Sequence, residues 1–486
     1  MTTSPGTPGL DGPVPTNPAV GRLTSQGPTP GALARRLGLR DAVVIGLASM
    51  IGAGAFVSLG AAQDLAGSLA PLAVLIAAAV ALCNATSTAQ LAAQHPSSGG
   101  TYHYGREQLG HWWGFLAGWC FVIGKIASCA AMALVISAYL VPEPLQRIVA
   151  ALVVVALTGV NLVGITRTAA LARVLVTVAL AALVLTGGRL LFGLSGASAG
   201  GAAEASGATA DSGAGLWAVP GPLAGARAGL WDGGLAAVLG AGTGGAAGIV
   251  LAVIQAAALM FFAFAGYARV ATLGEEVIAP RRTIPRAILV ALGVVAVLYL
   301  ALSVVLVLVG PAPGNQGWGP APFLTALQSV GAGEGWGVVI TVGAVAAASG
   351  ALLALVAGVS RTMLAMARGG DLPRPLAKSS NRYAVPQRAE AVAGIAIVLL
   401  VLLASNVLVA IAASSFGVLL YYAVANLAAL TQGDQWRLFP KALQVLGLIG
   451  CVLLVAALPG STVVAGVALV LLGVTYRAIV LALRHP

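Results

Sequence analysis

Long apolar segments recur along the chain, and each is long enough to cross a lipid bilayer as a helix. Because 59% of the residues are hydrophobic and only 8% are charged, a soluble domain could not hide this surface from water. At 1.5 Å per residue, about 20 helical residues cover the roughly 30 Å hydrocarbon core. The pattern predicts an all-α polytopic membrane protein with twelve transmembrane helices. The twelve apolar segments are residues 41–60, 70–92, 112–140, 146–165, 169–193, 249–272, 286–310, 336–367, 388–405, 407–430, 438–459 and 461–483.

The basic residues predict how these spans are oriented. With the N-terminus in the cytoplasm, 21 of the 25 Lys and Arg residues fall in cytoplasmic segments. Arg147, Arg189 and Arg227 then lie outside, and Lys125 lies within a span. Because loops rich in Lys and Arg stay in the cytoplasm, we expect a multi-pass protein of the cell membrane with both termini cytoplasmic.

Composition also divides the chain into regions. Residues 1–35 are rich in Pro, Gly and Thr, so we expect a disordered cytoplasmic tail. Residues 36–430 contain the first ten spans, and residues 436–486 contain two additional ones. The longest linker, about 195–245, is rich in Gly and Ala and nearly uncharged, which predicts a flexible outer segment with no domain of its own.

The distribution of polar residues excludes several classes of protein. The four cysteines and four histidines have no metal-ligand spacing, so we expect neither a metal nor a cofactor. No span carries a cluster of His, Asp, Glu or Cys that suits an enzyme, and the chain contains no P-loop motif of an ATP-driven pump. The net charge of +11 lies mostly in short loops, which indicates membrane orientation rather than nucleic-acid binding.

The first span contains two glycines near its centre, within the stretch from Ala48 to Phe56. Each glycine costs about 1 kcal/mol relative to alanine inside a helix. Their presence favours a helix that is interrupted there and leaves backbone N–H groups free for a ligand. The alternative is that Gly and Ala merely allow two helices to pack closely.

The sixth span, which should cross the membrane in the opposite direction to the first, also has a glycine near its centre. Aromatic residues lead to a lone Gly266, a basic Arg269 follows, and Glu275 and Glu276 come after it. The alternative is a packed aromatic core helix. Paired interruptions in two halves of a chain are typical of a transporter site between inverted repeats. One half-helix offers free N–H groups to a carboxylate and the other offers free carbonyls to an ammonium, so a zwitterion is bound at both ends.

Four stretches together resemble the amino acid–polyamine–organocation (APC) superfamily of permeases. They are Ile51–Phe56, the loop from Pro96 to Tyr102, the sixth span with the following loop up to Ala287, and the segment from Ser360 to Pro373. The resemblance covers about residues 40–430. It implies a five-plus-five inverted repeat with discontinuous helices 1 and 6, in which repeat one is about 41–193 and repeat two about 249–430. It also implies transport of amino acids by alternating access.

The resemblance assigns substrate contacts to the two interruptions. The first would face the substrate carboxylate and the second its amine and side chain. These expected substrate-binding residues are Ser49, Ile51, Gly52, Ala53, Gly54, Phe261, Phe262, Ala263, Phe264, Ala265 and Gly266. Two departures from the family pattern stand out. Ala268 replaces a frequent acidic residue, with Arg269 next to it, and the region near Ala179 lacks a lysine that some members have.

Lys125 is an ionisable residue deep within the third span. A lysine at the centre of a membrane helix costs about 2.5 to 3.5 kcal/mol, so its presence calls for a reason. We hypothesise that it carries a proton or replaces a coupling ion; the alternative is a structural lysine bonded to helix carbonyls. A fixed cation near the pathway would also favour neutral over cationic substrates.

The sequence therefore predicts a secondary active transporter of amino acids, with neutral ones favoured. An amino-acid sensor or a scaffold with the same fold is the alternative. Which amino acid is carried, proton symport against exchange, and the oligomeric state all stay open at this point.

Overall fold

The structure is a computed structural model that describes residues 37–96, 99–162, 168–200, 245–274, 276–311, 317–380 and 385–484. These residues belong to one compact unit, 35–486. The predicted N-terminal tail at 1–35 and most of the predicted outer linker lie outside the described residues. The linker itself begins later than expected, because the helix that precedes it continues to Gly200.

The described part of the chain is helical. One isolated β-bridge, between Leu37 and Val277, is the exception to the helices, turns and loops described there. The first half contains α1 (Leu39–Met50), α2 (Ala53–Ala66), α3 (Ala70–Gln94), α4 (Gly100–Leu109), α5 (His111–Leu140), α6 (Glu143–Leu162) and α7 (Thr168–Gly200). The second half contains α10 (Ala246–Phe264), the 3-10 turn η3 (Ala265–Tyr267), α11 (Ala268–Ala271), α12 (Pro280–Val309), α13 (Pro322–Ser329), α14 (Glu334–Arg368), α15 (Gln387–Leu403), α16 (Val407–Leu430), α17 (Lys441–Ala456) and α18 (Gly460–Arg484).

Nine helical segments among the described residues are long and apolar enough to cross a membrane. α2 and α3 form one of these segments together, and α17 is apolar but shorter. A helix or a pair of helices occupies each of the twelve ranges expected from the sequence. The number of crossings stays a prediction.

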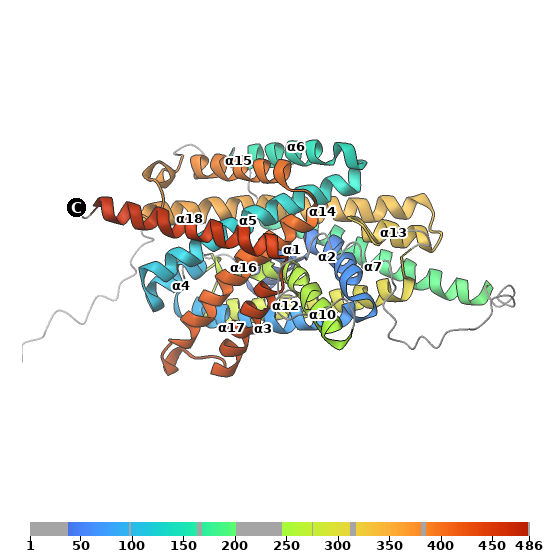
Figure 1. Ribbon diagram of the computed structural model, residues 1–486, viewed down its shortest axis with the longest axis horizontal. Coiled ribbons are helices and arrows are strands. Elements are labelled where there is room, and N and C mark those ends of the chain that lie inside the picture. The colour runs from blue at the N-terminus through green and yellow to red at the C-terminus, as the bar shows by residue number, and fades with distance from the viewer. Residues whose placement is uncertain are drawn as a thin grey trace, which may run out of the picture. The chain divides into compact units, whose positions relative to one another are not determined.

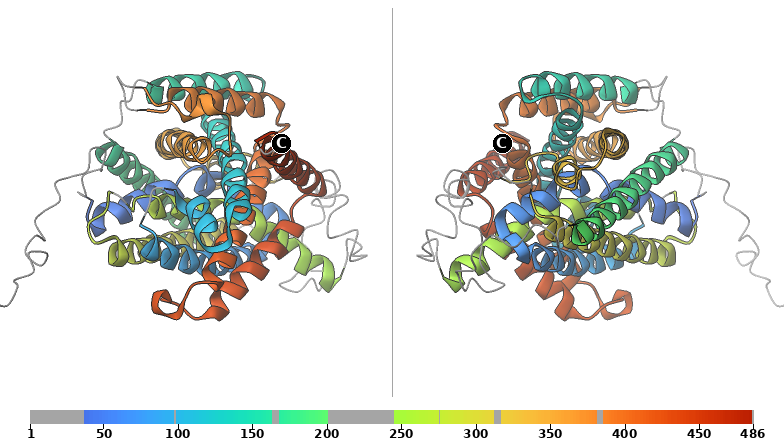
Figure 2. Two further views of the ribbon diagram at one scale, coloured as in Figure 1. Left: turned by 90° about the vertical axis from the view of Figure 1, so that its left-hand side faces the viewer. Right: turned by 90° about the vertical axis from the view of Figure 1, so that its right-hand side faces the viewer.

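The helix contacts follow a regular pattern (Figure 1). α5 packs against both α14 and α16, and α14 packs in turn against α7. α3 contacts both α12 and α10, and α1 contacts α12. α6 and α15 run side by side along one edge, which all views show (Figure 2). If each of the first five spans is replaced by the span five places later, and the reverse, the same pairs result. The α5–α16 pair becomes α14–α7, and the α3–α10 pair becomes α12–α1. A five-plus-five repeat has this property. The repeat itself stays a prediction.

Two helices, α4 and α13, lie where the sequence predicts only loops. α4 has the sequence GTYHYGREQL, which has no apolar run and so no membrane-span signal. It is nevertheless half buried, because Tyr102, Tyr104 and Gly105 pack inside the unit. A buried ion cluster also fixes α4. Its Arg106 contacts the Asp371 carboxylate at 3.0 Å, and Arg477 of α18 contacts the other oxygen of that carboxylate at 3.0 Å.

Tyr102 completes this cluster by donating its hydroxyl proton to Asp371 over 2.9 Å. Burial and the neighbouring carboxylate raise the pKa of Tyr102 to about 12, so the hydroxyl keeps its proton. α4, the segment after α14, and α18 are thereby tied together.

Candidate functional site

The first span is interrupted at Ile51 and Gly52, between α1 and α2. Ile51 leaves helical geometry at φ −80° and ψ 68°, and Gly52 precedes the first residue of α2. The amide of Gly52 donates to the carbonyl of Met50 over 2.9 Å, which closes a tight turn. The first N–H groups of α2 begin a new helix and therefore have no partner in a preceding turn. The interruption that the glycines predict is present here.

A tyrosine from a neighbouring helix stabilises this turn. The hydroxyl of Tyr299, on α12, donates to the Met50 carbonyl over 2.7 Å. Tyr299 is fully buried. The Met50 carbonyl, at the end of α1, thus has a hydrogen-bond donor inside the protein. Such pairing is expected, because a buried carbonyl without a partner costs free energy.

The sixth span is interrupted more mildly. α10 ends at Phe264, one 3-10 turn follows, and the four-residue α11 continues the path. The tighter turn releases the carbonyl of Ala265 from a normal α-helical bond. The expected gap at Gly266 is therefore a change of helix type rather than an unwound segment.

Two side chains bind the released carbonyl of Ala265. The ammonium of Lys125 donates to it over 3.1 Å, and the hydroxyl of Tyr422 donates over 3.2 Å. Lys125 is only 3% exposed. Its place is set by a close crossing of α5 and α16, where a Cβ on Gly417 would come 2.7 Å from the Cα of Gly124. The negative end of α10 thus meets a buried ammonium.

Glycines bring the two interrupted spans into direct contact. A Cβ on Gly266 would lie 2.1 Å from the carbonyl oxygen of Ser49. One on Gly54 would lie 2.5 Å from the Cα of Ala263. Only glycine permits this approach of the two backbones. Both explanations of the glycines therefore apply: Gly52 lies at the break, whereas Gly54 and Gly266 allow close packing.

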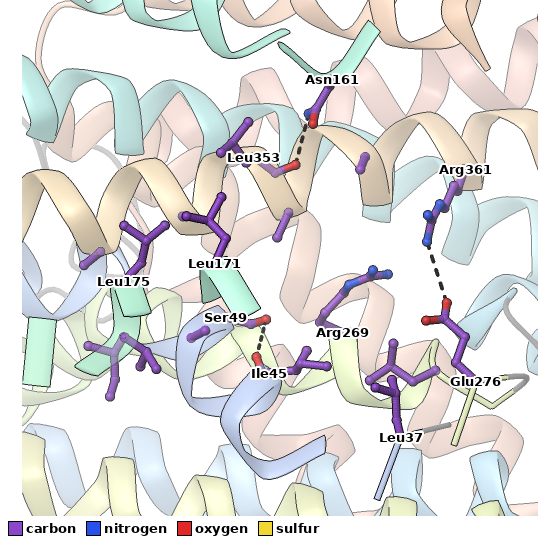
Figure 3. A pocket seen from close by; sticks show the side chains of 18 of the residues that line it. Leu37, Ile45, Ser49, Asn161, Leu171, Leu175, Arg269, Glu276, Leu353 and Arg361 are labelled. Atoms are coloured by element: carbon purple, nitrogen blue, oxygen red, sulfur yellow. Dashed lines mark hydrogen bonds and ion pairs between the residues drawn. The ribbon is translucent and has the colours of Figure 1, made fainter. Parts of the chain in front are cut away.

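A cavity of about 240 Å³ reaches the break from one side (Figure 3). Its lining includes Ser49 and Ile51. Figure 3 shows Arg269, Glu276 and Arg361 together on one side of it. The other lining residues are mostly apolar. They include Val160, Leu171, Leu175, Leu353 and Ala357. The hydroxyl of Ser49 is turned back to the Ile45 carbonyl, over 2.8 Å.

The opposite side of the break is filled by aromatic rings. Phe56 is fully buried and makes edge contacts with Tyr139 and Phe323, at 6.1 and 6.3 Å between ring centroids. A second cavity, of about 500 Å³, is lined by Ala138, which precedes Tyr139, and by Asp64, Glu143 and other residues. The break is thus accessible from one end and covered at the other.

The predicted binding residues divide accordingly. Ser49 and Ile51 line the 240 Å³ cavity. The nine others are buried and are not among its lining residues: Gly52, Ala53, Gly54, Phe261, Phe262, Ala263, Phe264, Ala265 and Gly266. Substrate contact by any of them stays a prediction. Within the described residues, no group of three or more His, Cys, Asp or Glu could hold a metal.

Sequence reasoning missed three polar residues of this region. Tyr299 and Tyr422 bind the released carbonyls, but a tyrosine in a long apolar helix carries no signal of its partner. Asn161 lies on the cavity wall and donates to the Leu353 carbonyl over 3.1 Å. Arg269, which precedes Glu275 and Glu276 in the sequence, has no ion pair with a carboxylate among the described residues. Instead its guanidinium donates to Thr272 over 3.1 Å, and Glu276 contacts Arg361 at 4.0 Å; Glu275 lies outside the described residues.

Comparison with known proteins places this architecture in a family. A model of the family described as "Amino acid permease" matches residues 41–483. The chain belongs to the amino acid permease family. This permease is 47% identical to an uncharacterised transporter of Mycobacterium tuberculosis. The alignment spans 449 residues, which are 92% of this chain and 91% of that protein. The family and these relatives identify it as a multi-pass membrane transporter.

More distant relatives have named substrates. The permease is 26% identical to a branched-chain amino acid permease of Bacillus subtilis, over 73% of this chain and 72% of that protein. It is 30% identical to the vacuolar cationic amino acid transporter 4 of Arabidopsis thaliana, over 75% of this chain and 58% of that protein. A substrate-bound, outward-open Na⁺-coupled sialic acid symporter shares the fold. The two structures superpose with a TM-score of 0.52 over 87% of this chain and 90% of that chain, and their sequences are 14% identical.

Proposed function

We propose that this permease is a secondary active transporter that moves amino acids across the cell membrane by alternating access, with neutral amino acids as the favoured substrates. The interruption at Ile51 and Gly52, at the end of a cavity, carries this proposal. A membrane interior tolerates such backbone only where it is buried in protein or faces an aqueous path. The symmetric helix pairs support a five-plus-five repeat, and movement of one repeat or bundle against another is how alternating access works in many transporters.

The described arrangement corresponds to one state of the cycle. The 240 Å³ cavity reaches Ser49 from the end that contains Arg269 and Arg361, which the distribution of basic residues assigns to the cytoplasm. Phe56, Tyr139 and Phe323 cover the break on the other side. The proposed state is therefore inward-facing. In the outward-facing state, the contact between the interrupted spans would open on the side of Phe56.

The two interruptions supply complementary groups for a zwitterion. The first N–H groups of α2 attract a carboxylate, because they are unpaired and lie at the positive end of the helix. The Ala265 carbonyl attracts an ammonium, and in the described state Lys125 supplies one. A substrate amino group that reaches this carbonyl would compete with Lys125.

This competition gives Lys125 its proposed role in coupling. Residues that face its ammonium are the Ala265 carbonyl, Tyr422 and, on its own helix, Cys129. No carboxylate within the described residues is paired with it. The charge of Lys125 is therefore balanced by the α10 dipole. Gain or loss of its proton changes how strongly the α10 end is held, which suits proton-coupled transport. In an exchanger, the fixed charge would instead take the place of a coupling ion.

A sensor that binds amino acids without moving them is the alternative, because the same break would serve both. Counterflow separates the two. Purified protein is reconstituted in vesicles loaded with each of the twenty amino acids in turn, and entry of a labelled neutral amino acid is measured. Substrate-dependent counterflow is expected of a transporter, and binding without exchange would support a sensor.

The matched control for that screen is Gly52→Leu. A Cβ at Gly52 would already meet Ala351 at 3.0 Å and Met132 at 3.3 Å, so a leucine has no room at the break. The expected result is full loss of counterflow in this variant. A variant that still exchanges as fast as the wild type would remove the break from the mechanism.

A further inference from the structure

The mouth of the 240 Å³ cavity carries more positive than negative charge. Arg269 and Arg361 both line it, and Glu276 is the one carboxylate among its described lining residues. All three side chains lie toward the same part of the cavity (Figure 3). The sequence gives no reason to expect this, because Arg269 belongs to the four-residue α11 and Arg361 to the distant α14.

The existing pairing leaves one guanidinium available. Glu276 contacts Arg361 at 4.0 Å, and these side chains are 32% and 52% exposed. An ion pair this long and this solvated contributes little. Arg269 donates one hydrogen bond to the Thr272 hydroxyl, and the structure gives it no ion pair with a described carboxylate. A guanidinium has five N–H donors, so most of its donor capacity remains.

The surroundings suit an amino acid. A carboxylate matches the planar fork of a guanidinium with two parallel hydrogen bonds. The same cavity is also lined by the apolar side chains of Leu171, Leu175 and Leu353, which suit an apolar substrate side chain. The cavity volume of about 240 Å³ leaves room for one small amino acid.

We propose that Arg269 forms a second carboxylate-binding site, separate from the break, which holds an amino acid at the cytoplasmic mouth before release. Arg361 adds positive charge, and Glu276 competes with the substrate carboxylate for both guanidiniums. The site discriminates against cationic amino acids, because their side chains would approach two fixed cations. This inference rests on the proposed function and on the orientation with the N-terminus inside.

Binding and transport are measured separately, so that the two proposals can fail separately. Stabilisation of the purified protein against heat is measured with leucine and with leucinamide, which keeps the side chain and amine but lacks the carboxylate. Leucine is expected to stabilise the wild type more than leucinamide does. In Arg269→Gln the difference is expected to shrink, and in Arg269→Lys, which keeps the charge without the fork, to be intermediate. Arg282→Gln is the matched control, because Arg282 is exposed at the start of α12 and does not line the cavity.

Transport is then measured from each side in vesicles of defined sidedness. In Arg269→Gln, the half-saturating leucine concentration is expected to rise about tenfold from the cytoplasmic side and less than twofold from the outside. In Arg269→Gln, lysine on the cytoplasmic side should inhibit leucine transport more strongly than it does in the wild type. In Glu276→Gln, lysine should inhibit leucine transport less strongly than in the wild type. Equal changes on both sides, or unchanged binding and transport, would overturn the second site. Arg269-dependent leucine binding without counterflow by the wild type would support the site and overturn the proposed transport.

Discussion

The ammonium of Lys125 and the carbonyl of Ala265 are 3.1 Å apart, and this bond joins the third span to the point where the sixth changes helix type. Tyr422 donates to the same oxygen. A charged side chain in a membrane span is costly unless it is paired, and here the partner is the end of a helix rather than a carboxylate. This explains how an isolated lysine is accommodated in an apolar helix.

Removal of this ammonium is expected to lower uptake and to abolish its dependence on pH. In Lys125→Ala the Ala265 carbonyl keeps only Tyr422, so we expect uptake to fall at least tenfold and to lose its dependence on pH. In Lys125→Arg the charge stays but cannot be lost, so uptake should also become independent of pH, with exchange retained. Uptake in reconstituted vesicles between pH 5 and pH 9 tests this. An unchanged pH dependence in both variants would leave Lys125 a purely structural role.

The contact between Gly266 and Ser49 is expected to tolerate no side chain. An alanine Cβ there would come 2.1 Å from the Ser49 carbonyl oxygen, which is backbone and cannot rotate away. We expect Gly266→Ala to reduce transport at least tenfold and to lower the apparent Tm. Gly293→Ala on α12 is the matched control, because no atom lies within 4 Å of its added Cβ. By helix propensity this control should be neutral or stabilise by up to about 1 kcal/mol. Wild-type activity of Gly266→Ala would contradict the close packing.

Loss of the Asp371 charge is expected to destabilise the fold. Asp371 is 6% exposed and contacts both Arg106 and Arg477, so Asp371→Asn leaves two guanidiniums without their carboxylate. Breaking a buried pair costs about 3 to 5 kcal/mol. We expect a clear drop in apparent Tm in detergent. Asp434→Asn is the matched control: its carboxylate, 92% exposed, pairs with Arg437 at 3.4 Å, and its loss should cost less than about 1 kcal/mol. Equal shifts in both variants would contradict the importance of burial.

The accessibility of the break is expected to differ between the two sides of the membrane. The four native cysteines are buried, so an impermeant maleimide should leave the wild type unlabelled. Ala357→Cys lines the 240 Å³ cavity, and Ala138→Cys lines the 500 Å³ cavity. We expect the first to label only from the cytoplasmic side and the second only from outside. The reverse labelling would show that the proposed orientation in the membrane is wrong. Labelling of each variant from both sides would show that Phe56, Tyr139 and Phe323 do not close the break.

The sequence by itself determined that the chain is helical, apolar and membrane-embedded, and where its long apolar helices lie. Hydrophobicity and helix period are local properties, so they can be read without knowing the fold. The glycines at Gly52 and Gly54 likewise predicted an interruption, because a glycine pair is costly in a continuous helix. The polar helix α4 escaped detection, since its burial depends on packing rather than on composition.

Only the tertiary structure decided which groups meet at the site. Nothing local indicates that Lys125 and Tyr422 share the carbonyl of Ala265, because these residues come from three spans far apart in sequence. Glu276 follows Arg269 closely in the sequence, but the folded chain places its carboxylate 4.0 Å from Arg361 on the distant α14. Hydrogen bonds and ion pairs depend on distances of a few ångströms between side chains, and such distances are set by how helices cross. The periodicity of a sequence does not contain them.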